Sequence, residues 1–203
     1  MKPAPRRRTE IAAAVAVLLL ATACAGGRSG TVYHSNFTAG YDPQSLGAAM
    51  SRAPLLVEAY GGPAPEAGED SLARTVALAL RRHGPSWLPR NYTDSAEDAG
   101  RAPYRLRVVY DTPRSFDRQQ LCGEALSAEA VEAARPAGAA AGDHVVAGLC
   151  RGATLLAVAE GAPATGAGPG SEAFAGFIGL LGREALPRRN PVLDDDCIFR
   201  RCD

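Results

Sequence analysis

The chain has 203 residues, 46% of them hydrophobic, which is enough for one domain with a sizeable core and leaves little room for a second. Its 22 basic and 22 acidic residues cancel each other. No stretch combines clustered Lys or Arg with interleaved aromatic residues, so the composition argues against a nucleic-acid-binding protein.

The first 23 residues have the three-part layout of an export signal. Lys2 and three arginines at positions 6–8 form a positive start, residues 11–20 are an unbroken apolar run, and three small residues follow at 21–23. The apolar run is about half of the roughly 20 residues that a membrane-spanning helix needs. We therefore expect a signal that is removed, which takes a net charge of +3 with it and leaves the mature chain near −3.

A cysteine follows the small residues directly. The sequence Leu-Ala-Thr-Ala-Cys at 20–24 resembles the lipobox of bacterial lipoprotein precursors. This resemblance, which covers about the first tenth of the chain, implies a removed signal peptide at 1–23, lipid on Cys24 and a flexible tether at 24–30. Ala21 stands where the family prefers Leu, Val or Ile, and an ordinary secreted protein cleaved near Ala23 is the alternative. Because Ala25 is not the Asp that marks inner-membrane retention, the resemblance implies an outer-membrane protein facing the periplasm in a Gram-negative cell.

The remaining cysteines are even in number. In an exported chain, four cysteines predict two disulfides, and here they are Cys122, Cys150, Cys197 and Cys202. Of the three possible connectivities we favour Cys122–Cys150 and Cys197–Cys202. A zinc site is the alternative. It needs short paired spacings or nearby histidines, whereas the close pair here is separated by four residues and has no His beside it.

The first half of the domain has the pattern of a β-α-β unit. Residues 31–50 predict an extended lead-in with room for one edge strand, and residues 55–60 form a β-prone run that ends at two glycines and a proline. Asp70 or Ser71 can cap a helix that ends at about His83. Residues 104–110 alternate apolar and charged side chains, which predicts a strand that runs parallel to 55–60 if the two are neighbours.

The second half predicts a hairpin and a helix. Residues 124–142 fit either a short helix or a loop, while 144–150 and 154–160 predict two antiparallel strands joined by a tight turn. Ser171 can cap a helix that stops at Pro187, and residues 188–203 predict an irregular tail closed by a disulfide. The whole predicts a single α+β domain over 31–187, in which helices cover one face of a mixed four-stranded sheet.

The sequence contains no recognisable set of catalytic residues. It lacks the Gly-x-Ser-x-Gly turn of many hydrolases, and its histidines, at positions 34, 83 and 144, lie in unrelated contexts. Glu58 lies within an apolar strand, where burial could suit it to acid catalysis. The simpler interpretation places Glu58 on the face opposite Val57, paired with Arg105 or Arg107 on a neighbouring strand.

Three other features are candidates for ligand binding. Gly168, Gly170 and Ser171 precede a helix and could bind an anion through backbone N–H groups, but the loop lacks the Lys of a phosphate-binding loop. The acidic run 194–196 lacks the alternation and the Gly turn of a calcium site. Trp87, the sole tryptophan, either fills the edge of the core or anchors a partner.

These observations favour a non-enzymatic lipoprotein of the cell envelope, without metal or cofactor, that binds another envelope component or supports an assembly. A small-molecule or anion-binding lipoprotein that uses the Gly-rich loop is the second hypothesis. A hydrolase that uses Glu58 is the third, and it requires a second acid facing Glu58 across a cleft.

Overall fold

A computed structural model of the chain describes residues 29–62, 71–112, 116–124, 126–134 and 144–195. Its strands are β1 (Gly30–Phe37), β2 (Leu55–Tyr60), β3 (Tyr92–Thr93), β4 (Tyr104–Tyr110), β5 (Val145–Arg151) and β6 (Thr154–Pro163). Its helices are α2 (Pro43–Met50), α3 (Leu72–His83), α4 (Ala96–Ala99), α5 (Ala128–Ala134), α6 (Glu172–Ala185) and α7 (Pro191–Asp195), together with the 3-10 helix η2 (Arg118–Cys122).

The strands form one mixed sheet in the order β1-β6-β5-β4-β2-β3. The predicted parallel pairing of β2 with β4 and the predicted β5–β6 hairpin are confirmed. The predicted four-stranded sheet is wrong, because the sheet has six strands. β1 extends it by pairing antiparallel with β6, and the two-residue β3, too short to give a periodic pattern, pairs with β2.

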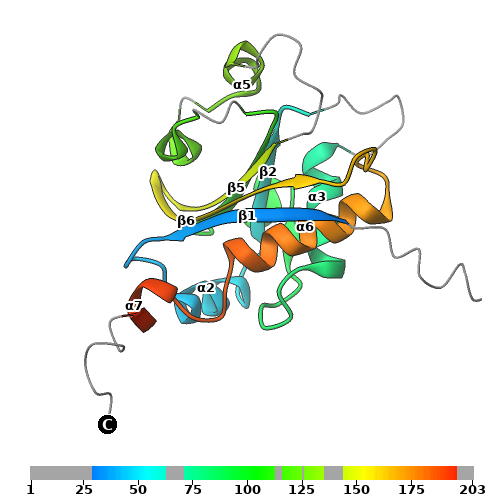
Figure 1. Cartoon of the computed structure of the whole chain (residues 1–203). Helices are drawn as coiled ribbons and strands as arrows, with labels where there is room; N and C mark the ends of the chain where they lie inside the picture. Colours follow the sequence, from blue (N-terminus) through cyan, green and yellow to red (C-terminus); the bar gives the residue numbers. More distant parts are fainter. Residues whose placement is uncertain (1–28, 63–70, 113–115, 125, 135–143, 196–203) are drawn as a thin grey trace, which may run out of the picture.

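One face of the sheet, the inner face, carries the main core. The helices α3 and α6, both predicted, cross each other on this face, and α2 covers it near the last residues of β1 (Figure 1). Ser71 and Ser171 cap α3 and α6 as expected, each accepting a hydrogen bond from the backbone N–H three residues on. The largest side chains buried here are Tyr41, Tyr92, Tyr110, Phe174 and Phe177.

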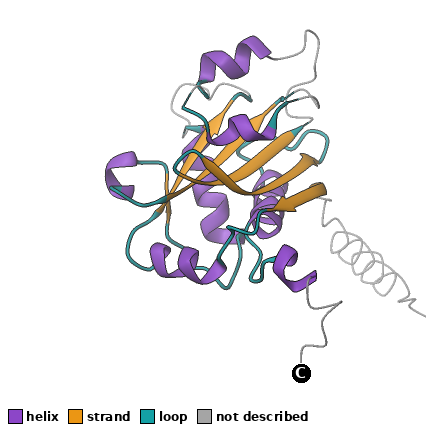
Figure 2. Ribbon diagram, turned by 90° about the vertical axis from the view of Figure 1, so that its left-hand side faces the viewer, coloured by secondary structure: helices purple, strands orange, loops and turns teal. Residues whose placement is uncertain are grey.

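The opposite face, the outer face, also has a cover. η2 and α5 lie over it and enclose a second, smaller apolar cluster that includes Val109, Val146 and both cysteines of a disulfide (Figure 2). A prediction of helices on one face alone is therefore incomplete. The reason lies in β4, where Arg105 and Arg107 alternate with buried apolar residues and make the outer face look solvated in the sequence.

The sheet has two distinct ends. At the Gly30 end lie the first residue of β1, the carboxyl ends of β2 and β4, and the first turns of α3 and α6. At the α2 end lie the last residues of β1, α2 itself, and the last turn of α6 (Figure 1). Because β1 has eight residues, the two ends are separated by about 26 Å along that strand.

The close crossing of α3 and α6 gives a first testable expectation. A Cβ at Gly179 would lie 2.3 Å from the Cβ of His83 and 2.6 Å from its backbone oxygen, so Gly179→Ala forces the helices apart. We expect a loss of about 2 kcal/mol in the free energy of unfolding, measured by urea denaturation.

Gly182→Ala is the matched control. Its new Cβ meets only the end of the Leu80 side chain, which can move, and alanine is favoured in helices by about 1 kcal/mol. We expect little net change in stability. Equal losses for the two alanine variants would contradict this account of the helix crossing.

Candidate functional site

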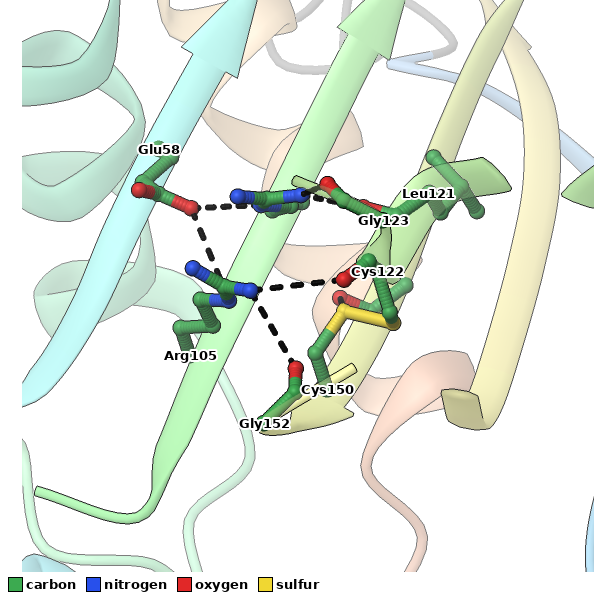
Figure 3. The surroundings of a disulfide bond; sticks show 9 residues. Glu58, Arg105, Leu121, Cys122, Gly123, Cys150 and Gly152 are labelled. Atoms are coloured by element: carbon green, nitrogen blue, oxygen red, sulfur yellow. Dashed lines mark hydrogen bonds and ion pairs between the residues drawn. A yellow bond between two sulfur atoms is a disulfide. The ribbon is translucent and has the colours of Figure 1, made fainter. Parts of the chain in front are cut away.

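Glu58 lies on the outer face, opposite Val57, and is held by two arginines. The parallel register of β2 and β4 places it beside Arg107, whose Nε donates to its carboxylate at 2.6 Å, while the Nε of Arg105 is 4.0 Å away (Figure 3). The side chain of Arg107 is nearly buried, and its guanidinium also lies over the Tyr60 ring. This arrangement matches the simpler interpretation of Glu58 as an ion-pair partner.

The same arginines bind backbone oxygens at the end of η2. Arg107 Nη1 donates to the oxygens of Leu121 and Gly123, at 2.9 and 2.6 Å. Arg105 Nη2 donates to the oxygens of Cys122 and Gly152, at 3.3 and 3.2 Å. Both guanidinium groups therefore hold the outer cover on the sheet, and Figure 3 shows Arg105 beside the disulfide.

The disulfide joins Cys122, the last residue of η2, to Cys150 on β5. This predicted pairing is confirmed, and both cysteines are fully buried. The other predicted pair, Cys197–Cys202, and the lipidation residue Cys24 lie outside the described residues. Disulfide, arginines and apolar contacts together attach η2 to the outer face, which gives this region a structural role.

A second acid on the outer face escaped the sequence analysis. Glu160 on β6 is only 5% exposed, accepts a hydrogen bond from Arg118 Nε, and lies 3.3 Å from His144 Nε2. His34, at the opposing position on β1, faces it as well. Burial favours the neutral acid, but the hydrogen bond and charge of Arg118, with smaller contributions from His144 and His34, hold the pKa of Glu160 below 4.5.

The neighbourhood of His144 has the outline of a hydroxyl–imidazole–carboxylate relay. Its Nδ1 lies 2.9 Å from the hydroxyl of Thr112, but it also lies 2.8 Å from the backbone oxygen of the same residue. A carbonyl oxygen can only accept, so Nδ1 carries the proton that satisfies it and cannot also receive a proton from the hydroxyl. The cluster therefore links β4, β5 and β6, and this geometry does not activate Thr112 as a nucleophile.

The pH dependence of stability tests the Glu160 cluster. A lowered pKa means that ionised Glu160 stabilises the fold above about pH 4.5, and that this contribution is lost as the pH falls through the lower folded-state value. We expect wild type to be more stable than Glu160→Gln at pH 7, and the difference to shrink as the pH falls below 4.5, measured by urea unfolding at each pH. A difference that stays constant with pH would contradict the assignment.

The Gly-rich loop does not gather polar groups. Gly168 and Gly170 are exposed, and a Cβ added at either would meet nothing within 4 Å. The hydroxyl of Ser171 is already used, because it accepts from Phe174 N and donates to the backbone oxygen of Gly168. The structure thus assigns Ser171 a capping role, and the loop lies at the Gly30 end of the sheet.

Metal ligands do not converge in the described part of the chain: no group of three or more His, Cys, Asp or Glu residues there could hold an ion. His83 lies at the end of α3, with Nε2 3.0 Å from the carboxylate of Glu172. The side chains of the acidic run 194–196 lie outside the described part of the structure. None of the described helices is long and apolar enough to cross a membrane.

A shallow open groove lies at the α2 end and has a volume of about 640 Å³. Three separate segments line it: one face of α2, the turn after α3, and the chain after α6. The lining residues are Pro43, Gln44, Gly47, Ala48, Ser86, Trp87 and Arg188. We call this feature the α2–Trp87 groove.

Trp87 serves both as core and as groove wall. It is half-buried and packs against the inner core, and its Nε1 donates to the Leu186 oxygen at 3.0 Å, which fixes the orientation of the ring. Gly47 and Ala48 add little bulk beside it, while Gln44 and Ser86 are exposed and offer an amide and a hydroxyl. The groove therefore combines one rigid aromatic side chain with several hydrogen-bonding groups.

The lining of the groove contains one charged residue, which is basic. Arg188 is the charged residue of the lining, Arg189 beside it is exposed, and Arg52 bonds to the backbone oxygen of Ala48 at 3.2 Å. The nearest acid in the sequence, Asp42, caps α2, where its hydrogen bond with Ser45 lowers the pKa of its carboxyl. Arg188 is therefore the group of the lining that would bind an anionic ligand.

Of the two interpretations of Trp87, the one in which it fills the edge of the core is confirmed, and anchoring of a partner stays a prediction. The other groove residues gave no signal in the sequence. Gln44, Ser86 and Arg188 are far apart in the chain, and α2 was hidden in what the sequence predicts as an extended lead-in. An Asp-Pro pair with Leu46 and Met50 one turn apart was the available signal for that helix. No protein-family model matches the chain, and neither a curated protein nor a solved structure shows a significant similarity to it.

Proposed function

We propose that the protein is a bacterial lipoprotein, held at a membrane by lipid on Cys24, whose domain is a non-enzymatic binding or assembly-accessory protein of the cell envelope. The α2–Trp87 groove is the binding site in this proposal. In a Gram-negative cell the protein faces the periplasm from the outer membrane.

The groove is the observation that carries the proposal. It joins a rigid indole, exposed hydrogen-bonding groups and an exposed guanidinium in one concave surface, which is the composition of a recognition site. Among the described residues, the acids that could suggest catalysis lie elsewhere and hold the fold together: Glu58 binds two arginines, and Glu160 binds Arg118. This engagement gives no support to a hydrolase that uses Glu58.

In-cell crosslinking tests the proposal. A photo-crosslinking amino acid at Gln44, which is exposed in the groove, is expected to capture a defined envelope component in living cells. The matched control is the same amino acid at Gln119, which is exposed on η2 at the outer face. Crosslinks from Gln119 alone, or from neither position, would overturn the assignment of the groove.

A further inference from the structure

We propose that the α2–Trp87 groove binds an acidic glycan, meaning a sugar polymer that carries carboxylates, and that it does so on the side of the domain facing away from the anchoring membrane. This inference rests on the proposed function, since it names the ligand class of the same groove. Three observations carry it: the charge of the groove, the character of its lining, and its place relative to Gly30.

The positive charge of Arg188 favours a ligand that carries carboxylates. A guanidinium is a preferred partner for carboxylates because it donates paired hydrogen bonds in a fixed plane, and the exposed Arg188 lines the groove. The other charged neighbours of the lining are of both signs: Arg189 and Arg52 are basic, while Asp42 at the start of α2 and the exposed Glu184 at the end of α6 are acidic. The groove is therefore complementary to a ligand that bears carboxylates.

The lining favours a sugar over a peptide. A peptide that binds tightly inserts a large apolar side chain into an enclosed, desolvated pocket, and this groove is shallow and open. Trp87 is its single large apolar side chain, beside small residues such as Gly47 and Ala48. An indole accommodates the C–H face of a sugar ring, while Gln44 and Ser86 can exchange hydrogen bonds with ring hydroxyls.

Position separates this ligand from the membrane. Residues 24–30 would join the lipid to the first residue of β1, and β1 then runs for about 26 Å before the chain reaches α2. The helix α2, which lines the groove, thus lies at the end of the sheet opposite Gly30 (Figure 1). This placement favours a polymer beyond the anchoring membrane over its own lipid headgroups.

Binding to defined oligosaccharides tests the inference. The protein is purified as cells process it, and equilibrium dialysis measures its binding of a uronate tetrasaccharide and a neutral hexose tetrasaccharide. Because Trp87 is the sole tryptophan, a change in protein fluorescence on binding places the ligand at the groove. We expect the uronate to bind at least about tenfold more tightly than the neutral sugar, through contacts equivalent to one charge-assisted hydrogen bond.

Two arginine variants provide the control. Arg188→Gln is expected to weaken uronate binding about tenfold, whereas Arg74→Gln, the same change of charge in the first turn of α3 at the Gly30 end, is expected to leave it unchanged. Equal binding of the charged and neutral sugars, or equal losses for both variants, would overturn the role of the carboxylate.

A glutamate tetrapeptide and anionic lipid vesicles provide the competing ligands. Binding of either at least as tightly as the uronate would overturn the glycan in favour of an acidic peptide or a membrane surface. If no oligosaccharide binds while Gln44 still crosslinks a component in cells, the glycan inference fails and the proposed function stands. If Gln44 captures nothing either, both fail.

Discussion

Removing the Cys122–Cys150 disulfide is expected to lower the free energy of unfolding by about 3–4 kcal/mol. The two cysteines are 28 residues apart, and a loop of that length loses about this much chain entropy in the unfolded state when it is closed. Because single domains are stable by only about 5–15 kcal/mol, the loss is a large fraction of the total. Urea unfolding of Cys122→Ala/Cys150→Ala measures it.

The reduced wild-type protein is the control for this expectation, since it loses the bond but keeps both side chains. Reduced wild type and the alanine variant are expected to differ only by the smaller packing contribution of the two buried sulfur atoms. If the reduced wild-type protein were as stable as the oxidised one, this account would be contradicted, because the bond would then contribute nothing to holding η2.

Replacing Arg107 by leucine is expected to cost about 3 kcal/mol. The guanidinium is nearly buried and bonds to Glu58 and to the oxygens of Leu121 and Gly123, so leucine leaves a carboxylate and two carbonyl groups without their donor. Arg105→Leu should cost about 1 kcal/mol, because Arg105 is more exposed and its bonds are longer. Urea unfolding of the two variants gives the comparison.

The stability losses caused by Arg107→Leu and by removal of the disulfide should not be additive. Arg107 and the disulfide hold the same segment, so once η2 has lost one attachment the other stabilises less. We expect the combined variant to lose at least about 0.5 kcal/mol less than the sum of the two separate losses. Full additivity would contradict the view that both attach one cover to the outer face.

Much of the inner core could be predicted from local patterns. β2 and β4 are short apolar or alternating runs bounded by turn residues. α3 and α6 have serine caps and an apolar stripe. Each of these elements can therefore be recognised from its own residues. Strand alternation also placed Glu58 on the face opposite Val57. The even number of cysteines predicted two disulfides, and the closeness of Cys197 to Cys202 in the sequence favoured the pairing of Cys122 with Cys150.

The features that were missed depend on contacts between distant parts of the chain. The contact of Glu160 with Arg118 forms only because η2 folds across β5 and β6, whereas its approach to His144 follows from the β5–β6 hairpin that the sequence predicts. Glu160 carried the same signal as Glu58, an acid within an apolar strand, and could have been found by the same argument. The α2–Trp87 groove, which three segments build, gave no local pattern apart from its tryptophan.

The proposed role of the groove depends on attachment of the chain at Cys24, and lipid labelling tests that attachment most directly. Cells fed a clickable palmitate analogue are expected to incorporate the label into the wild-type protein, and mass spectrometry should find a mature N-terminus at a diacylglycerol-modified Cys24. Cys24→Ser should abolish both the label and this processing. A labelled band of unchanged size and intensity in the Cys24→Ser variant would contradict the claim that lipid on this cysteine anchors the protein.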